Sequence, residues 1–324
     1  MKKTGLWNGA GAVVGVAAMG AAVYASTDFL VKVAMDRQLP NIHNLDRHRD
    51  RLRGYLNCDK FLAQMSAQGE KLKNASHKTV HIRGRDGQTL VGHLFACPEP
   101  KRIILAMHGW RSSWYSDFGM IADFWHAQGC SVLYAEQRGQ GNSGGSYMGF
   151  GLTERYDCLM WSRWLASQFH LPIYLAGVSM GATTVLMVAG LKLPESVRGI
   201  MADCGFTSVH SIWKHVAEKN LHLQYRMHSL VADRLYRERL QIGTGDYSTL
   251  DAMKVCKVPV LFIHGTEDHF VPVEMTYENY QACKAPKSLL IVPGADHGMS
   301  FYREPQRYQQ TMIDFWRAIE TKPI

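Results

Sequence analysis

The sequence predicts an α/β protein whose mostly parallel central sheet carries helices on both faces. Three observations favour this fold class. Short, nearly continuous apolar runs alternate with segments of helical pattern, as in strands that are buried on both faces. The loops after these runs are rich in glycine, serine, aspartate and histidine, and functional loops follow the carboxyl ends of the strands in such sheets. With 324 residues, the chain is long enough for one large domain with an insertion.

The predicted strands and helices alternate along the chain. Residues 79–83 and 89–95 are expected to form an opening hairpin, because Arg85-Asp86-Gly87 between them is a turn sequence. The remaining predicted strands are apolar runs at residues 102–107, 131–135, 173–176, 197–202, 258–263 and 288–292. Helical patterns cover residues 118–128, 153–169, 182–189 and 305–319.

The alternation stops once, between residues 207 and 257, where a long stretch without a strand pattern separates two predicted strands. Its pattern is helical, and it carries aromatic and histidine side chains: Trp213, His215, His222, Tyr225, His228 and Tyr236. An insertion above the carboxyl edge of the sheet would cover a pocket there, so we predict a helical cap with an apolar lining. The alternative is that the insertion packs beside the core as scaffold.

The most informative motif is Gly177-Val178-Ser179-Met180-Gly181. A serine on a tight turn between a strand and a helix projects its hydroxyl outward. The residues beside it must be small, because the strand and helix backbones pass close together there. Residues 173–176 supply the strand and residues 182–189 the helix. Ser179 is therefore the candidate nucleophile.

A serine hydroxyl becomes a good nucleophile only when a neighbouring base takes its proton. His297 is the candidate base, because it lies in a Gly- and Asp-rich loop after the last predicted strand. A carboxylate must orient the imidazole and stabilise its charged form. Asp268, in the loop after the preceding strand, is the candidate acid, and Glu267 and Asp296 are the alternatives. The side chain of Asp296 is expected to point elsewhere, since it adjoins His297 in sequence.

The oxyanion of a tetrahedral intermediate needs preorganised hydrogen-bond donors, usually backbone amides. The first candidate is the amide of Met180, at the start of the helix after the serine, where the helix dipole adds positive potential. The second is the amide of Trp110, in His108-Gly109-Trp110 after the third predicted strand. We expect His108 to brace this loop rather than to take part in the chemistry.

Together these motifs resemble those of the α/β-hydrolase superfamily, in its serine-nucleophile branch. They are most similar to bacterial membrane-anchored α/β hydrolases or serine-aminopeptidase-like esterases. The resemblance covers residues 77–320 and implies an α/β-hydrolase fold with a small helical cap. Two departures stand out. Residues 136–141, Glu-Gln-Arg-Gly-Gln-Gly, stand where the superfamily often has Asp-x-Arg-Gly-His-Gly. The Gly-rich oxyanion loop of many lipases is absent, which disfavours a lipase-type substrate.

The implied reaction is hydrolysis of a carboxylic ester or related acyl bond of a small molecule, through an acyl-enzyme on Ser179. No metal or organic cofactor is implied. The alternative is a serine exopeptidase of the aminopeptidase type, which would need an acidic group near the pocket. The predicted cap offers Glu218, Asp233 and Glu238 for that role. A hydrolase-fold binding protein without turnover is a third interpretation, which the intact triad disfavours.

The N-terminal segment predicts a membrane partner. Lys2 and Lys3 precede an uncharged stretch rich in Ala, Gly and Val, in which residues 5–25 would span about 30 Å as a helix, enough to cross a hydrocarbon core. We favour an uncleaved anchor with an extracytoplasmic catalytic domain. The alternatives are a signal peptide cleaved after Val23-Tyr24-Ala25 and a buried amphipathic helix.

The predicted division comprises an anchor or signal peptide (1–27), a helical linker (28–76), the hydrolase core (77–206 and 258–324) and the cap (207–257). The net charge of +8 is spread without dense basic blocks, so no nucleic-acid partner is expected. The 7 cysteines lack metal-ligand spacing and are expected to be mostly small buried side chains. We expect no cysteine nucleophile, because none of them stands at a sharp turn.

Overall fold

The computed structural model describes residues 7–40 and 59–321, so residues 41–58 of the predicted linker and Cys58 lie outside the described residues. One sheet has the strand order β1-β2-β4-β3-β5-β6-β7-β8. Only β2 pairs antiparallel with its neighbours, β1 and β4, while every other pair is parallel, which confirms the predicted sheet. The strands are β1 (Lys78–Arg83), β2 (Thr89–Phe95), β3 (Arg102–Met107), β4 (Cys130–Ala135), β5 (Ile173–Val178), β6 (Val197–Asp203), β7 (Val260–Gly265) and β8 (Lys287–Val292).

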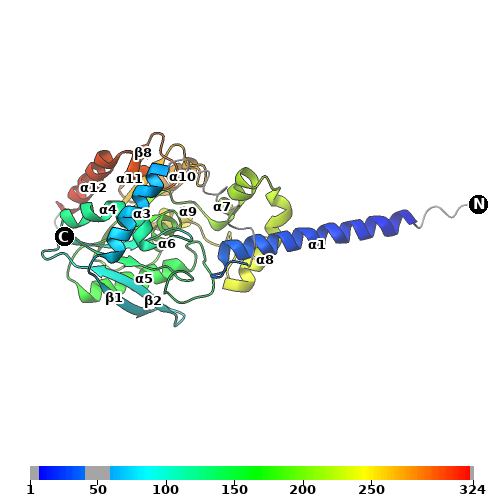
Figure 1. Ribbon diagram of the computed structural model, residues 1–324, viewed down its shortest axis with the longest axis horizontal. Coiled ribbons are helices and arrows are strands. Elements are labelled where there is room, and N and C mark those ends of the chain that lie inside the picture. Colours follow the sequence, from blue (N-terminus) through cyan, green and yellow to red (C-terminus); the bar gives the residue numbers. More distant parts are fainter. Residues whose placement is uncertain (1–6, 41–58, 322–324) are drawn as a thin grey trace, which may run out of the picture.

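Helices cover both faces of the sheet (Figure 1), because side chains alternate along buried strands and both faces must be shielded from water. In β3, Ile103 and Leu105 join one core cluster and Ile104 and Ala106 the other. The first cluster packs under α5 (Glu154–Gln168), α6 (Met180–Val188), α9 (Thr249–Val255) and α10 (Val273–Ala282). The second packs under α3 (Asp59–Asn74), α4 (Trp114–Ala127), α11 (Ser300–Arg303) and α12 (Pro305–Glu320).

A third cluster lies above the carboxyl edge of the sheet. Its members come from the end of α1 (Trp7–Met35), from α7 (Val209–His215), from α8 (Tyr225–Leu240), and from α6, α10 and loops of the core. A π-helical turn, η1 (Val216–Asn220), joins α7 to α8. The fully described stretch 207–257 is helical without a strand, but its last helix, α9, packs against α6 and α10 in the core layer. The domain division itself stays a prediction.

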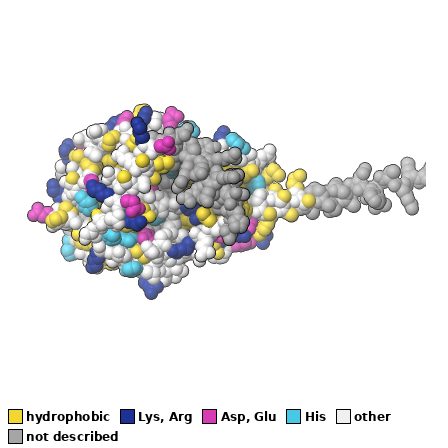
Figure 2. Space-filling view, viewed as in Figure 1, with side chains coloured by type: hydrophobic (Ala, Val, Ile, Leu, Met, Phe, Trp, Pro, Cys, Tyr) yellow, Lys and Arg dark blue, Asp and Glu magenta, His cyan; other side chains and the backbone are white. Residues whose placement is uncertain are grey.

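Helix α1 runs without a break through the predicted boundary between residues 27 and 28. Thr27, Val31 and Met35, four residues apart on one helical face, are buried. The part of the helix that precedes these residues projects from the body (Figure 1). Figure 2 shows hydrophobic side chains on the described part of the helix, where it leaves the body. Within the described residues, no helix combines the length and the apolar character needed to cross a membrane.

Two of the longer helices differ from the sequence predictions. The helix expected from residue 118 already begins at Trp114, because the Ser113 side chain accepts a hydrogen bond from the amide of Ser116 and caps its first turn. Helix α10 was not predicted, although Pro272 directly before its first residue is a typical helix start. Both helices support the sheet edge from which the site residues project.

Candidate active site

Ser179 occupies the sharp turn between β5 and α6. Its φ of 56° and ψ of −119° lie in a region that residues with a side chain rarely adopt, at a cost of about 1–3 kcal/mol. A Cβ added to Gly181 would lie 1.8 Å from the carbonyl oxygen of Met107, and one on Gly177 would lie 2.3 Å from the carbonyl carbon of Gly181. The two glycines therefore permit the close approach of strand and helix that the strained turn requires.

The candidate base and acid reach this serine from two other loops. The Nε2 atom of His297 lies 2.9 Å from the Oγ atom of Ser179, and its Nδ1 atom lies 2.7 Å from an oxygen of Asp268. Because an ionised carboxylate only accepts hydrogen bonds, Nδ1 carries the proton in the neutral ring. Nε2 is then free to accept the proton of the serine hydroxyl. The structure thus brings the three predicted triad residues together.

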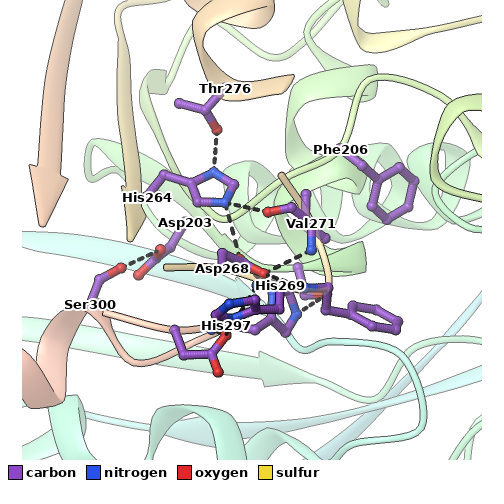
Figure 3. A network of polar contacts seen from close by, with 12 residues as sticks. Asp203, Phe206, His264, Asp268, His269, Val271, Thr276, His297 and Ser300 are labelled. Atoms are coloured by element: carbon purple, nitrogen blue, oxygen red, sulfur yellow. Dashed lines mark hydrogen bonds and ion pairs between the residues drawn. The ribbon is translucent and has the colours of Figure 1, made fainter. Parts of the chain in front are cut away.

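Asp268 is held by its own loop and by a second histidine, which the sequence analysis missed (Figure 3). Its Oδ1 atom accepts hydrogen bonds from the amides of Phe270 at 2.9 Å and Val271 at 2.8 Å. Its Oδ2 atom lies 3.0 Å from Nε2 of the fully buried His264, which also lies 2.9 Å from the carbonyl oxygen of Val271. Since both neighbours are acceptors, Nε2 of His264 is protonated, and its Nδ1 accepts from the Thr276 hydroxyl at 2.7 Å.

Burial disfavours the charges of Asp268 and His297, but the attraction between them prevails. Burial by itself would raise the pKa of the Asp268 carboxyl, yet the charge of His297 and the hydrogen bonds from both histidines lower this pKa below its ordinary value. Burial would lower the pKa of the His297 imidazole, yet the charge of Asp268 raises this pKa well above 6.5. The charge of Asp268 therefore favours the imidazolium form of His297, as an acid in a catalytic triad does.

The other acidic side chains near His297 face different partners. Glu267 is exposed, and an Asp296 oxygen accepts hydrogen bonds from the amides of His269 and His297 at 3.2 and 2.7 Å. Asp203 at the end of β6 is buried and accepts a hydrogen bond from the Ser300 hydroxyl at 3.0 Å. Of these carboxylates, only Asp268 hydrogen-bonds to the His297 imidazole in the described part of the chain.

The two predicted oxyanion donors lie beside the nucleophile. A Cβ added to Gly109 would be 3.4 Å from the Cβ of Ser179, so the loop that carries Trp110 lies against the serine. Met180 is the first residue of α6, and the amide at this position has no partner within its own helix. Within residues 7–40 and 59–321, neither the Trp110 nor the Met180 amide donates a hydrogen bond to another group. Both are therefore available to a developing oxyanion, and their role stays a prediction.

The loop with Trp110 is braced on its inner side. One oxygen of Asp117 accepts a hydrogen bond from the Gly109 amide at 2.6 Å, and the other accepts from the Ser112 hydroxyl at 2.5 Å. Nε2 of His108 accepts from the Gln137 amide at 3.1 Å, so Nδ1 is protonated and donates to the Gly109 carbonyl at 2.8 Å. Burial lowers the pKa of His108, so this ring is neutral. His108 contacts the loop backbone and not the triad.

Cys204 corrects one expectation. It directly follows β6 with a φ of 51°, so the premise that no cysteine stands at a sharp turn is wrong. Burial raises the pKa of its thiol to about 11, however, which makes it a poor nucleophile near neutral pH. Its sulfur and ligand atoms of Asp268 and His297 all lie within 4.8 Å of one another, the spacing of a possible metal site within the described residues. Two of these three side chains already bond to each other.

Aromatic rings extend from the triad toward the cap. Phe270 lies 5.2 Å from the His297 ring and stacks on Trp110 at 6.5 Å, measured between ring centroids. Trp110 lies 6.2 Å from Phe150, whose ring meets Trp213 of α7 edge-on at 5.6 Å. Phe150 itself has a φ of 52°, a left-handed backbone that is unusual for a bulky residue. The groups beside Ser179 are therefore largely apolar on the cap side.

Known proteins share the sequence pattern and the fold. The sequence model of the prolyl oligopeptidase family matches residues 116–320. The uncharacterized protein YqkD of Bacillus subtilis is 29% identical over 193 residues, which cover 58% of this chain and 62% of YqkD. The uncharacterized protein YfhR of Escherichia coli is 27% identical over 144 residues, which cover 44% of each chain. The chain thus spans less than two thirds of these two relatives.

Solved structures with the same architecture include esterases and a peptidase. An esterase of Pyrococcus furiosus superposes with a TM-score of 0.62 at 22% identity, covering 78% of this chain and 93% of the esterase. Est1E of Butyrivibrio proteoclasticus, solved with ferulic acid, gives 0.58 at 19% identity, covering 75% and 100%. A puromycin-hydrolyzing peptidase of Mycobacterium tuberculosis gives 0.60 at 18% identity, covering 77% and 40%. The predicted α/β-hydrolase fold is confirmed.

Proposed function

Because this chain belongs to the prolyl oligopeptidase family, we propose that it is a serine hydrolase that cleaves carboxylic esters or related acyl bonds through an acyl-enzyme on Ser179. One observation carries the proposal: His297 bridges Ser179 and Asp268 with hydrogen bonds of 2.9 and 2.7 Å. A base that is oriented by a carboxylate and in contact with a serine at a strained turn is the arrangement that activates a hydroxyl.

The reaction would proceed in two displacements. His297 Nε2 takes the hydroxyl proton as Ser179 Oγ bonds to the carbonyl carbon, and the amides of Trp110 and Met180 stabilise the oxyanion. The carbon–oxygen bond to the leaving group then breaks, and the alkoxide receives the proton from His297. Water, deprotonated by the same nitrogen, attacks the acyl carbon, releases the carboxylic acid and restores the serine.

Two features of the cap side favour an ester with an apolar acyl or alcohol group over an aminopeptidase substrate. The aromatic row from His297 to Trp213 supplies apolar contacts and no fixed negative charge. Two of the three candidate amine-binding acids of the cap are already paired, Asp233 with Arg237 at 2.8 Å and Glu238 with Arg234 at 2.8 Å. A free substrate amine would have to compete with these arginines.

The nucleophile is tested by Ser179→Ala. We expect kcat for a p-nitrophenyl ester to fall by about 10⁵–10⁶-fold, because loss of a triad nucleophile leaves only binding and oxyanion stabilisation. Labelling by a fluorophosphonate probe should vanish as well. Ser167→Ala, at an exposed position on α5, is the matched control and should keep full activity. Ester turnover that survives Ser179→Ala would overturn the mechanism.

The substrate class is tested by comparing p-nitrophenyl esters of increasing acyl length with aminoacyl-nitroanilides on the wild-type protein. We expect kcat/KM to be highest for an ester and to rise with acyl length, because each methylene buried against the aromatic row adds about 0.8 kcal/mol. Faster turnover of the anilides would establish the peptidase alternative instead.

We further propose that the N-terminal segment holds the protein at a membrane, with the catalytic domain outside the cytoplasm. Supporting this are the projection of α1 from the body and the exposure of Met19, Tyr24 and Phe29, residues that are 61%, 49% and 40% accessible. Fractionation of cells, with protease treatment of intact cells, tests both parts. Recovery in the soluble fraction alone would contradict the proposal, and a mature mass lacking residues 1–25 would establish the cleaved signal peptide.

A further inference from the structure

The oxyanion loop (residues 108–111) reaches out of the core to the end of α1. Arg111 has a φ of 49°, a left-handed backbone that is unfavourable for a residue with a side chain. Its Nε and Nη2 atoms donate to the carbonyl of Val33 at 3.0 and 2.7 Å, and Nη2 also donates to the carbonyl of Asp36 at 2.6 Å. The indole nitrogen of Trp110 donates to the carbonyl of Ala34 at 2.8 Å.

The carbonyl groups of Val33 and Ala34 belong to the last turn of α1, where helical carbonyls have no partner in their own helix, and that of Asp36 directly follows this turn. The negative end of the helix dipole adds to the attraction for a guanidinium. The planar fork of an arginine bonds two carbonyls at once, which a lysine ammonium on its flexible stem does not reproduce. Arg111 therefore caps the carboxyl end of α1 and in return has its own backbone fixed.

The end of α1 is itself held to the body from several sides. Met35 is fully buried, and its carbonyl accepts a hydrogen bond from the amide of Met148 at 2.8 Å. The Arg37 amide donates to the Ser146 carbonyl at 2.8 Å, and Asp36 pairs with Arg239 of α8 at 3.0 Å. The turn of α1 to which Arg111 donates hydrogen bonds is thus held by the body, so it can restrain the loop.

We propose that Arg111 is a positioning residue for the proposed reaction, and that its hydrogen bonds to the end of α1 hold the Trp110 amide where the oxyanion forms. The inference rests on the proposed function and extends it. Asp117 braces the loop at Gly109 and Ser112, but the contacts to Val33, Ala34 and Asp36 are what restrain the strained segment around Trp110. The N-terminal helix is accordingly part of the catalytic apparatus.

The test compares Arg111→Ala, Arg111→Gly and Arg111→Lys with the wild type in ester hydrolysis. Removing an oxyanion donor outright lowers kcat by about 10²–10³-fold, so displacing one in Arg111→Ala is expected to cost about 10–100-fold. KM should change by less than about twofold, because the interaction develops in the transition state. Arg111→Gly should lose less, since glycine adopts a positive φ without strain. Arg111→Lys should fall near Arg111→Ala, because it lacks the fork.

A second readout separates positioning from folding. A trifluoromethyl ketone that forms a hemiketal with Ser179 places its oxyanion in the same hole, whereas the corresponding secondary alcohol forms none. We expect the inhibition constant of the ketone to rise by the factor by which kcat falls, and that of the alcohol to stay constant. Arg317→Ala removes an exposed arginine of α12 that pairs with Asp314, and it serves as the control with unchanged kinetics.

The outcomes are distinguishable. Unchanged kcat and ketone inhibition in Arg111→Ala, with turnover that still depends on Ser179, would overturn the positioning role and leave the proposed function intact. Equal losses for the ketone and the alcohol would also overturn it, because they would indicate general disruption of the pocket. If Arg111→Ala does not fold, the Gly and Lys variants decide by the same criteria. Turnover that survives Ser179→Ala would instead reject the proposed function.

Discussion

The triad side of the site (Ser179, Asp268 and His297) and its oxyanion loop are held by different parts of the chain. Each triad residue lies in the loop after its own strand, and its partners are amides and side chains of the same edge of the sheet. The oxyanion loop also follows a strand, but its tip bonds to Val33, 78 residues earlier in the sequence. The triad is positioned by the sheet, whereas the oxyanion loop also depends on α1, a helix outside the sheet.

The comparison indicates that the activity should respond differently to substitutions in these two parts of the site. Substitutions on the triad side remove reacting groups or their immediate hydrogen bonds, so they should affect the chemistry directly. Changes in α1 should reach the chemistry through Trp110 and Arg111. Measured effects should therefore fall steeply from the triad, through the groups that hold it, to the contacts of α1 with the cap.

Asp268→Asn should give the largest effect among the groups that support Ser179 and His297. An asparagine presents the wrong donor pattern to the imidazole, so kcat should fall by about 10⁴-fold with little change in fold. The residual activity should also show a shifted pH profile. Activity requires neutral His297 and falls as the pH drops through its pKa, which the charge of Asp268 raises. Without that charge, the acid limb of kcat/KM should move to lower pH.

A pH profile of Asp268→Asn with an acid limb unchanged from the wild type would contradict this assignment. Glu267→Gln alters the neighbouring exposed acid and is the matched control, for which both rate and profile should stay unchanged. A large loss of kcat in Glu267→Gln, together with retained activity in Asp268→Asn, would identify Glu267 as the acid in place of Asp268.

His264→Phe tests a residue that contacts the triad through Asp268 and does not touch Ser179. The variant removes the donor to Asp268 and leaves the carboxylate with fewer hydrogen bonds in a buried place. The loss of a hydrogen bond to a charged group is worth about 1.5–3 kcal/mol, so we expect kcat to fall by about tenfold or more. His264→Gln keeps an amide donor near the position of Nε2 and should recover part of the rate. Equal kcat in both variants would show that the donor is unimportant.

Thr27→Val tests the outermost contact, between α1 and the cap. The Thr27 hydroxyl lies 2.7 Å from Nδ1 of His228 on α8 and 2.6 Å from the carbonyl of Val23. Its removal should lower the free energy of unfolding by about 1 kcal/mol and leave kcat unchanged, as followed by thermal unfolding and ester hydrolysis. Ser26→Ala, which removes a hydroxyl that bonds to the carbonyls of Ala22 and Val23 in its own helix, is the control. A large loss of kcat in Thr27→Val would contradict the expected decrease in effect from the triad to the contacts of α1.

The same division explains what the sequence made predictable. The strands, the elbow and the triad residues follow from local patterns, because each reactive residue adjoins an apolar run or a glycine turn. Cys204 also stands at such a turn, but cysteines carry no turn pattern that would reveal it. His264 was passed over because a histidine at the end of a strand gives no sign of its partner until the next loop folds back.

The role of α1 lay beyond local patterns for a different physical reason. Its hydrophobic composition predicts a membrane segment, and nothing in the helix itself indicates that Thr27, Val31 and Met35 are buried by the core. Contacts between residues far apart in sequence depend on shapes that only the folded chain supplies. The partners of Arg111 are main-chain carbonyls, which leave no trace in the residue types of α1.

The left-handed backbone at Arg111, Phe150, Ser179 and Cys204 sets a limit on how far this protein can be stabilised without loss of activity. Each such residue is disfavoured by about 1–3 kcal/mol relative to a relaxed conformation. Glycine at Phe150 or Cys204 would relieve that penalty, but it would leave a cavity in place of a buried ring of the aromatic row or a buried neighbour of His297, and the cavity costs more than the strain. Selection for heat resistance should therefore find its gains elsewhere, in the helices and the sheet, and spare these four positions.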